Sequence, residues 1–199
     1  MNYLGTHLSN DGRIDSELNR RIGMLKGDFL KLQKIWKHSS LVRERKLHIF
    51  KALIESKLYY CLSCAVFTKA ALRRLDGFQC RCLRKILGIA PAYVSRVSNA
   101  EVLRRSQHEA ASAQLLKRQL LLLGRVVRAP DHNPMKVASF IPNTLEPATN
   151  RYVRSVGRPR LEWVPRMLKE AFLIAGGERA FVQKVQSPVA WRQAVYGRG

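Results

Sequence analysis

The sequence has few acidic residues for its size: 14 Asp and Glu stand against 36 Lys and Arg in a chain of 199 residues. The formal net charge of +22 is spread evenly, because residues 1–100 hold 19 basic and 7 acidic residues and residues 101–199 hold 17 and 7. This distribution excludes a neutral domain with a basic tail. A charge field of one sign repels itself unless a polyanion neutralises it, so nucleic acid is the first partner to expect.

Long hydrophobic runs are also missing. The leucine run at 120–123 is far shorter than the about 20 apolar residues that a membrane-spanning helix needs. Residues 1–9 lack the basic region and apolar stretch of a secretory signal. We therefore expect an intracellular chain, cytoplasmic or nuclear, that is not secreted and has no membrane partner, with its cysteines as reduced thiols.

Motifs for catalysis are absent as well. The sequence has no P-loop, no GxSxG, no HExxH and no pair of aspartates at the spacing of a two-metal site. The five histidines are scattered along the chain. We expect no catalytic residues and no cofactor, and hence a chain that is not an enzyme by itself.

Four cysteines raise the alternative of a zinc-stabilised module. Cys61 and Cys64 are spaced CxxC, but Cys80 and Cys82 are spaced CxC inside a helical pattern. On a helix, two residues that are two positions apart point about 200° apart and cannot share one ion. The sequence therefore favours no metal site, with Cys61 and Cys82 as small core residues.

Helical periodicity dominates after a short strand-like start. Residues 3–9 (YLGTHLS) read as a strand, residues 10–12 (NDG) as a turn and Arg13 as the start of a return strand, which predicts a β-hairpin. The spacing of apolar residues then predicts helices from Asp15 to about His38, from Ser40 through residue 67, from Thr68 to Gly88, and from Ser98 to Arg128 with a break. The expected fold class is mainly α, with an N-terminal hairpin, a helical bundle and a basic C-terminal helical extension.

Helix signals are specific at several of these boundaries. Asp15, Ser40 and Thr68 are candidate N-caps, and Gly88 stands where a left-handed C-cap would fall. Residues 98–101 (SNAE) form a capping-box pattern. Residues 130–160 hold five of the eight prolines and predict a basic linker or extended arm. A helix is expected over 164–175, where Gly176 and Gly177 break it, and a further short helix starts at Ser187 as N-cap.

Basic helix faces are the candidate binding surface. Guanidinium and ammonium groups at one-turn or two-turn spacing can follow a phosphate backbone. Arg74, Arg81 and Arg84 are expected on one side of the third helix. The full set of candidate nucleic-acid-binding residues is Arg20, Lys31, Lys34, Arg73, Arg74, Arg81, Arg84, Lys85, Arg118, Arg125, Arg158 and Arg160.

The last two of these belong to GRPR at residues 157–160. This stretch is similar to the core of an AT-hook, in which an extended Arg-Pro-Arg enters the A·T minor groove. It leaves an alternative function open: a free-standing basic helical nucleic-acid-binding protein with an AT-hook-like arm.

The order of motifs resembles the end of a LINE-type (non-LTR) retrotransposon reverse transcriptase. No single motif is specific, but the ordered set covers nearly the whole chain. The stretches that carry the resemblance are YLG at 3–5, NDGR at 10–13, ELNRRIG at 17–23, KIW at 34–36, 46–60, TKAALRRL at 68–75, FQCRCLRKILGI at 78–89, VSNAEVL at 97–103, LGRVVRAP at 123–130 and GRPRLEW at 157–163.

The resemblance implies a domain organisation. Residues 1–14 would be a remnant hairpin from the edge of a polymerase palm, 15–129 a thumb-like helical domain, 130–160 the linker or arm, and 161–199 a C-terminal helical segment. The family's catalytic aspartates, its endonuclease and its Cys/His knuckle have no counterpart here, and Arg125 stands where the family often has histidine. The implied function is a non-catalytic fragment that grips an RNA or DNA template–primer duplex through its backbone, normally beside a palm domain, as expected for a truncated element copy.

Overall fold

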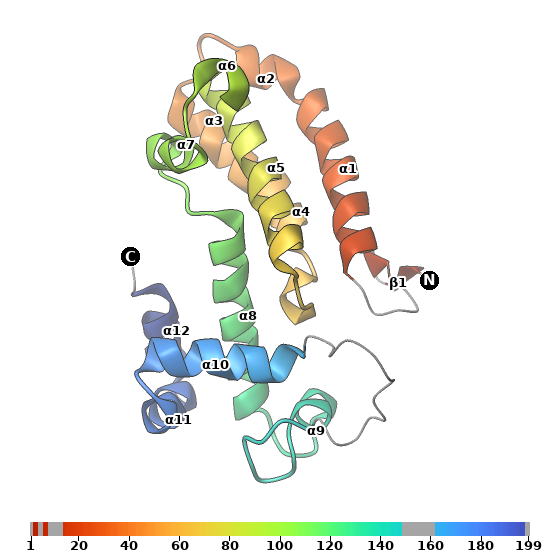
Figure 1. Ribbon diagram of the computed structural model, residues 1–199, viewed down its shortest axis with the longest axis vertical. Coiled ribbons are helices and arrows are strands. Elements are labelled where there is room, and N and C mark those ends of the chain that lie inside the picture. Colours follow the sequence, from red (N-terminus) through yellow and green to blue (C-terminus); the bar gives the residue numbers. More distant parts are fainter. Residues whose placement is uncertain (1, 4–5, 8–13, 149–161, 198–199) are drawn as a thin grey trace. The chain divides into compact units, whose positions relative to one another are not determined.

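The computed structural model describes residues 2–3, 6–7, 14–148 and 162–197, and these residues are mainly helical (Figure 1). The chain divides into two compact units, residues 1–115 and 116–199. The boundary falls inside the long helix α8, Ala111–Arg128. The sequence had placed the boundary after residue 129. The difference arises because Leu120 and Leu123 of α8 belong to the core of the second unit.

The first unit begins with the two-residue strands β1, Asn2–Tyr3, and β2, Thr6–His7, which pair antiparallel. This pairing differs from the predicted hairpin, because both strands fall within or beside the stretch 3–9 that was expected to be one strand. The predicted turn at residues 10–12 lies outside the described residues. The described part of the chain therefore does not support the hairpin as predicted.

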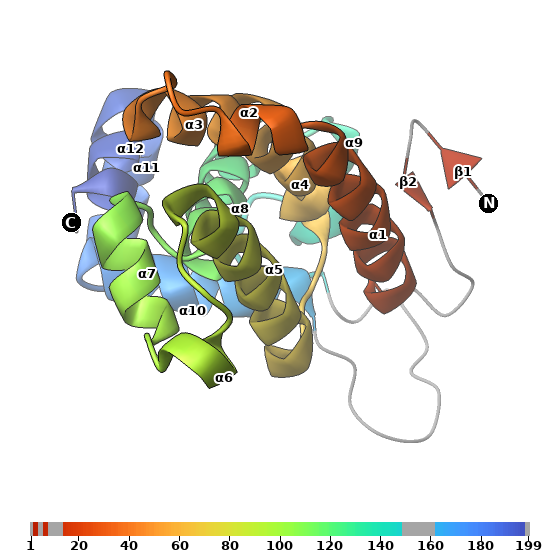
Figure 2. The same cartoon turned by 90° about the horizontal axis from the view of Figure 1, so that it is seen from above.

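Helices make up the rest of the first unit (Figure 2). They are α1 Asp15–Lys31, α2 Gln33–Lys37, α3 Arg43–Phe50, a π-helical turn Lys51–Glu55, α4 Ser56–Tyr59, a 3-10 turn Leu62–Cys64, α5 Lys69–Leu87, α6 Ala92–Ser95, α7 Asn99–Ser106 and the start of α8. Apolar residues of these helices, such as Leu18, Phe50 and Leu75, are buried in one core. Trp36 stacks on Phe29 and donates from Nε1 to its carbonyl oxygen at 2.8 Å, which fixes α2 against α1.

Two predicted helix starts are wrong. The N-cap of α1 is Ile14, without a side-chain hydrogen bond, so Asp15 is the first helical residue rather than the cap. The second helix begins at Arg43 rather than after Ser40, and it ends at Tyr59 because Cys61 takes a left-handed conformation with φ 55°. Cys61 is consequently exposed and is not the core residue that was expected.

The second unit is built around its own core. It contains the remainder of α8, α9 Pro134–Ser139, α10 Trp163–Ala175, α11 Glu178–Gln186 and α12 Pro188–Tyr196. Trp191 is fully buried, stacks edge-on against Phe181 and donates from Nε1 to the carbonyl oxygen of Leu120 at 2.8 Å. The break at Gly176 and Gly177 is confirmed by their φ values of 90° and 125°.

The predicted linker is partly folded. Residues 134–139 form α9, Phe140 pairs with Pro147 in an isolated β-bridge, and the Phe140 side chain is buried. Burial of the Phe140 side chain thus stabilises a folded conformation in a segment whose proline content predicted a linker. Residues 149–161, which include GRPR, lie outside the described residues.

Candidate nucleic-acid interface

Helix α5 is the longest element of the first unit and is fixed at both ends. The Thr68 side chain accepts a hydrogen bond from the Ala71 amide at 3.1 Å, and Gly88 closes the helix with φ 68°, so both predicted caps are confirmed. One face, which includes Leu75 and Phe78, is buried in the core. Gln79, Cys80, Leu83 and Arg84 are buried as well, so α5 is covered on most of its circumference. Its exposed residues are Lys69, Ala70, Arg73, Arg74, Arg81 and Lys85.

Three of these exposed cations form what we call the α5 stripe: Arg73, Arg81 and Lys85. All three are exposed, and among the described residues none has a carboxylate within ion-pair distance. Gly77 lies between Arg73 and Arg81, and the Arg81 guanidinium extends over it. A rise of 1.5 Å per residue separates Arg73 from Arg81 by about 12 Å and Arg81 from Lys85 by about 6 Å.

Arg74, although also exposed, contacts helix α1. Its Nη1 donates to Asn19 Oδ1 at 2.9 Å, and its Nη2 forms an ion pair with Asp15. Both partners lie on α1, so Arg74 ties α5 to α1. Because its charge is already opposed by a carboxylate, it is a weaker candidate for a phosphate than the sequence suggested.

Arg84 is a correction to the predicted site. Only 5% of its surface is exposed, and Nη2 donates to the carbonyl oxygen of Val97 at 2.6 Å and to Asn99 Oδ1 at 3.1 Å. The guanidinium provides a hydrogen-bond donor to a backbone carbonyl group of the segment that joins α6 to α7. A group held in this way is not available to an external phosphate.

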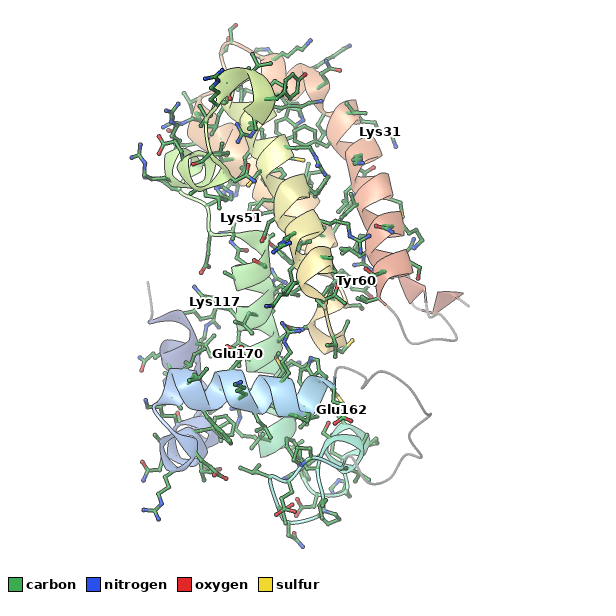
Figure 3. The ribbon with its side chains drawn as sticks, in the orientation of Figure 1. Lys31, Lys51, Tyr60, Lys117, Glu162 and Glu170 are labelled. Carbon is green, nitrogen blue, oxygen red and sulfur yellow. The ribbon has the colours of Figure 1, made fainter. Side chains whose placement is uncertain are left out.

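Of the candidate cations on α1 and α2, one is held in a close ion pair and two are exposed to solvent. Arg20 forms an ion pair with the buried carboxylate of Glu17 at 2.8 Å. Lys31 is largely exposed, and its Nζ lies 3.7 Å from Asp28 Oδ1 (Figure 3). Lys34 is also exposed. Arg21, which the sequence analysis passed over, is buried with Glu17 and donates to the carbonyl oxygen of Lys57 at 3.2 Å.

In the second unit, Arg118 and Arg125 are both exposed on α8. Arg128 of the same helix donates to the carbonyl oxygen of Val185 at 2.8 Å and is structural. Arg158 and Arg160 lie outside the described residues.

The cysteines do not gather into a ligand set. Cys61 and Cys64 are exposed, whereas Cys80 and Cys82 are buried on α5. In the described part of the chain, no group of three or more His, Cys, Asp and Glu side chains is arranged to hold a metal ion. Burial raises the pKa of Cys82 to about 12, which keeps this thiol protonated and disfavours it as a ligand.

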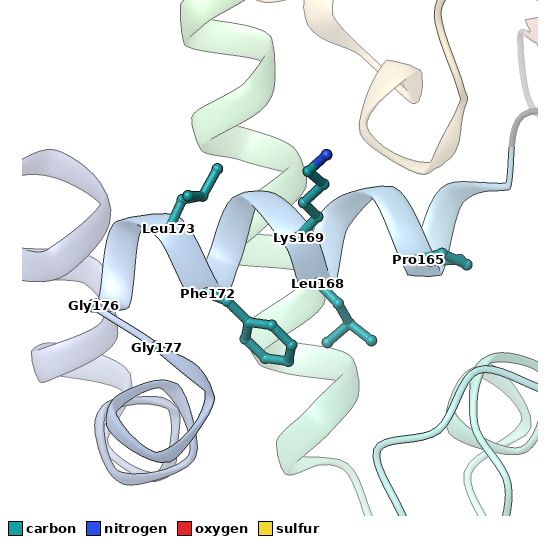
Figure 4. Close-up of a pocket in the computed structure, with 7 residues that line it drawn as sticks. All are labelled: Pro165, Leu168, Lys169, Phe172, Leu173, Gly176 and Gly177. Carbon is teal, nitrogen blue, oxygen red and sulfur yellow. The ribbon is translucent and has the colours of Figure 1, made fainter.

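A shallow depression of about 650 Å³ lies on α10 (Figure 4). Its lining residues are Pro165, Leu168, Lys169, Phe172, Leu173, Gly176 and Gly177. This lining is apolar apart from one ammonium group and offers no acid, base or nucleophile pair for chemistry.

Among the described residues, no helix is long and apolar enough to cross a membrane. Comparison with known proteins identifies no relative: no protein-family model, no curated protein and no solved structure matches the chain.

Proposed function

We propose that this chain binds nucleic acid through basic helix faces, by contacts to the phosphate backbone and without sequence specificity. The observation that carries the proposal is the α5 stripe. Arg73, Arg81 and Lys85 are exposed on a helix anchored at both ends, and no carboxylate among the described residues neutralises them. Cations that the protein leaves unopposed along one helix are suited to a polyanion such as a phosphate backbone.

The overall charge supports the same assignment. With 36 cations and 14 acids, most Lys and Arg side chains have no carboxylate to pair with. Several acids already form ion pairs within the chain, such as Glu17 with Arg20 and Glu101 with Arg104. The remaining positive field attracts DNA and RNA over the range of the Debye length.

The resemblance to LINE-type reverse transcriptases gives the proposal its finer form. In that setting the helices of the first unit would act as a thumb that grips a template–primer duplex, and a basic C-terminal extension would follow them. The partner would be a palm domain carrying the catalytic aspartates, and the chain itself would contribute grip without chemistry, inside the cell.

Loss of charge at the stripe tests the proposal. We compare the triple variant Arg73→Gln, Arg81→Gln, Lys85→Gln with wild type by fluorescence anisotropy, using a blunt DNA duplex and an RNA–DNA hybrid. The matched control is Lys26→Gln, Lys37→Gln, Arg45→Gln, which removes the same charge from other exposed positions of the first unit. The stripe variant is expected to bind more weakly than the control on both probes, and equal affinities would reject the stripe as the interface.

The AT-hook-like arm is the competing assignment. It predicts a preference for A·T-rich duplexes that Arg158→Ala or Arg160→Ala would abolish. Backbone binding predicts that these substitutions weaken binding to A·T-rich and G·C-rich duplexes alike. The ratio of the two affinities, measured for wild type and each variant, separates the two functions.

A further inference from the structure

Tyr93 is the most exposed large apolar side chain of the described residues. Its exposed fraction is 86%, and the adjacent Val94 is 61% exposed. Both lie on the short helix α6, which connects α5 to α7 (Figure 1). Within the described residues the Tyr93 side chain makes no ring stacking, cation–π contact or hydrogen bond. An aromatic ring with both faces in water has apolar area left to cover.

The backbone beneath this ring is held firmly. Arg84 reaches the loop that follows α6 through the carbonyl oxygen of Val97, and Ser95 Oγ accepts from the Val97 amide at 3.3 Å. Within α6, the Val94 and Ser95 amides donate to the carbonyl oxygen of Pro91 at 3.0 and 2.9 Å. The ring is thus presented from a fixed segment, so little backbone entropy is lost when something binds to it.

The segment that carries Tyr93 has no negative charge. Residues 77–100 contain four cations and no acidic residue, a signal that the sequence analysis did not use. The next carboxylate along the chain, Glu101, is engaged by Arg104 and Arg105 at 2.7 Å each. Arg96, three residues after Tyr93, is exposed and has no partner among the described residues.

We propose that Tyr93 is a stacking platform for an unpaired base of single-stranded nucleic acid, with the neighbouring phosphates held by Arg96 and by Lys85 of the α5 stripe. This inference rests on the proposed function and names the substrate form that it favours. An exposed ring in a segment that carries cations and no acids matches a base between phosphates better than it matches an apolar protein surface. Bases inside a duplex have both faces covered by their neighbours, so an unpaired base offers the ring a face that an internal base pair does not.

The test compares Tyr93→Ala and Tyr93→Phe with wild type on three probes of equal length: a DNA strand, the same strand with abasic sites, and a blunt duplex. Tyr93→Ala is expected to weaken binding to the intact strand by about 5- to 150-fold, the range for one base stacked on an aromatic side chain. Its affinity for the abasic strand and the duplex is expected to stay at the wild-type value. Tyr93→Phe, which keeps the ring, is expected to bind all three probes as wild type does.

Tyr60→Ala is the control, because Tyr60 is another exposed tyrosine of the first unit. Circular dichroism confirms that each variant is folded. If Tyr93→Ala binds the intact strand as wild type does, or loses affinity equally on all three probes, the stacking platform is rejected while the proposed function stands. If wild type binds neither strand nor duplex, the proposed function is rejected and this inference with it.

Discussion

Arg84 Nη2 lies 2.6 Å from the carbonyl oxygen of Val97 and donates a hydrogen bond to it. This contact separates Arg84 from Arg81, which is three residues earlier on α5 and exposed. Two arginines of one helix therefore have different roles, one internal and one directed to solvent.

Arg84→Gln is expected to destabilise the first unit, because the Val97 carbonyl and Asn99 lose a charged donor in a buried site. The expected loss is about 1.5–3 kcal/mol, the usual value of hydrogen bonds to a charged group. Arg81→Gln is expected to change the free energy of unfolding by less than about 0.5 kcal/mol, since exposed substitutions rarely do more. Urea unfolding of the two variants measures both values. Equal stabilities would show that Arg84 is not structural.

Gly124→Ala is expected to destabilise the second unit. A Cβ at this position would overlap the indole of Trp191, whose Nε1 is already committed to the Leu120 carbonyl oxygen. Overpacking of this kind costs about 1–3 kcal/mol. Thermal unfolding followed by tryptophan fluorescence reports the change.

Gly23→Ala is expected to stabilise the first unit. A Cβ at Gly23 meets nothing within 4 Å, and the residue lies inside α1. Alanine is favoured over glycine in a helix by about 0.5–1 kcal/mol, so this variant is expected to be more stable than wild type. A Gly23→Ala variant that is less stable than wild type would contradict the open space at this position. For the preceding prediction, a Gly124→Ala variant more stable than wild type would contradict the packing of Trp191 against Gly124.

The two cysteine pairs are expected to react at different rates with a thiol reagent. Cys82 is buried and its pKa is raised to about 12 by burial, so almost no thiolate exists at pH 8. Cys61 is exposed and is expected to react first. Mass spectrometry after timed alkylation gives the order, and early modification of Cys82 in the folded protein would overturn this part of the fold.

The titration of the Glu101 carboxyl predicts how the stability of α7 depends on pH. Hydrogen bonds from Arg104 and then Arg105 lower the pKa of this carboxyl from 4.5 to about 2. Because the pKa in the folded state is depressed, the stabilisation of the start of α7 is complete above about pH 4.5 and is lost as the pH falls through about 2. A carboxyl titration by NMR should find this midpoint, and Arg104→Gln should raise it. A midpoint near 4.5 in wild type would show that the two arginines do not engage Glu101.

Local signals predicted helix α5 well. The N-cap at Thr68, the left-handed Gly88 and the apolar period between them are properties of neighbouring residues, and α5 follows them. The same holds for Ser98, whose side chain accepts from the Glu101 amide at 3.1 Å, and for Ser187, which caps α12.

Local sequence signals could not predict which residues, far apart in the sequence, would contact one another. Whether Arg74 is free depends on Asp15, which is 59 positions away, and whether Arg84 is free depends on a carbonyl 13 positions away. The wrong helix end near Cys61 has a similar cause, because the apolar run gave no sign of the left-handed residue that stops the helix. Tyr93 was missed because exposure of one aromatic residue has no local pattern.

The measurement that tests the account most directly is the salt dependence of binding to a DNA duplex, for wild type and for the triple stripe variant. The logarithm of the wild-type binding constant is expected to fall linearly with the logarithm of the salt concentration. Each lost phosphate contact reduces the slope by about 0.9, so the triple variant is expected to show a slope shallower by about 2 to 3. Wild-type affinity that stays constant from low to high salt, or a triple variant with the wild-type slope, would contradict the account.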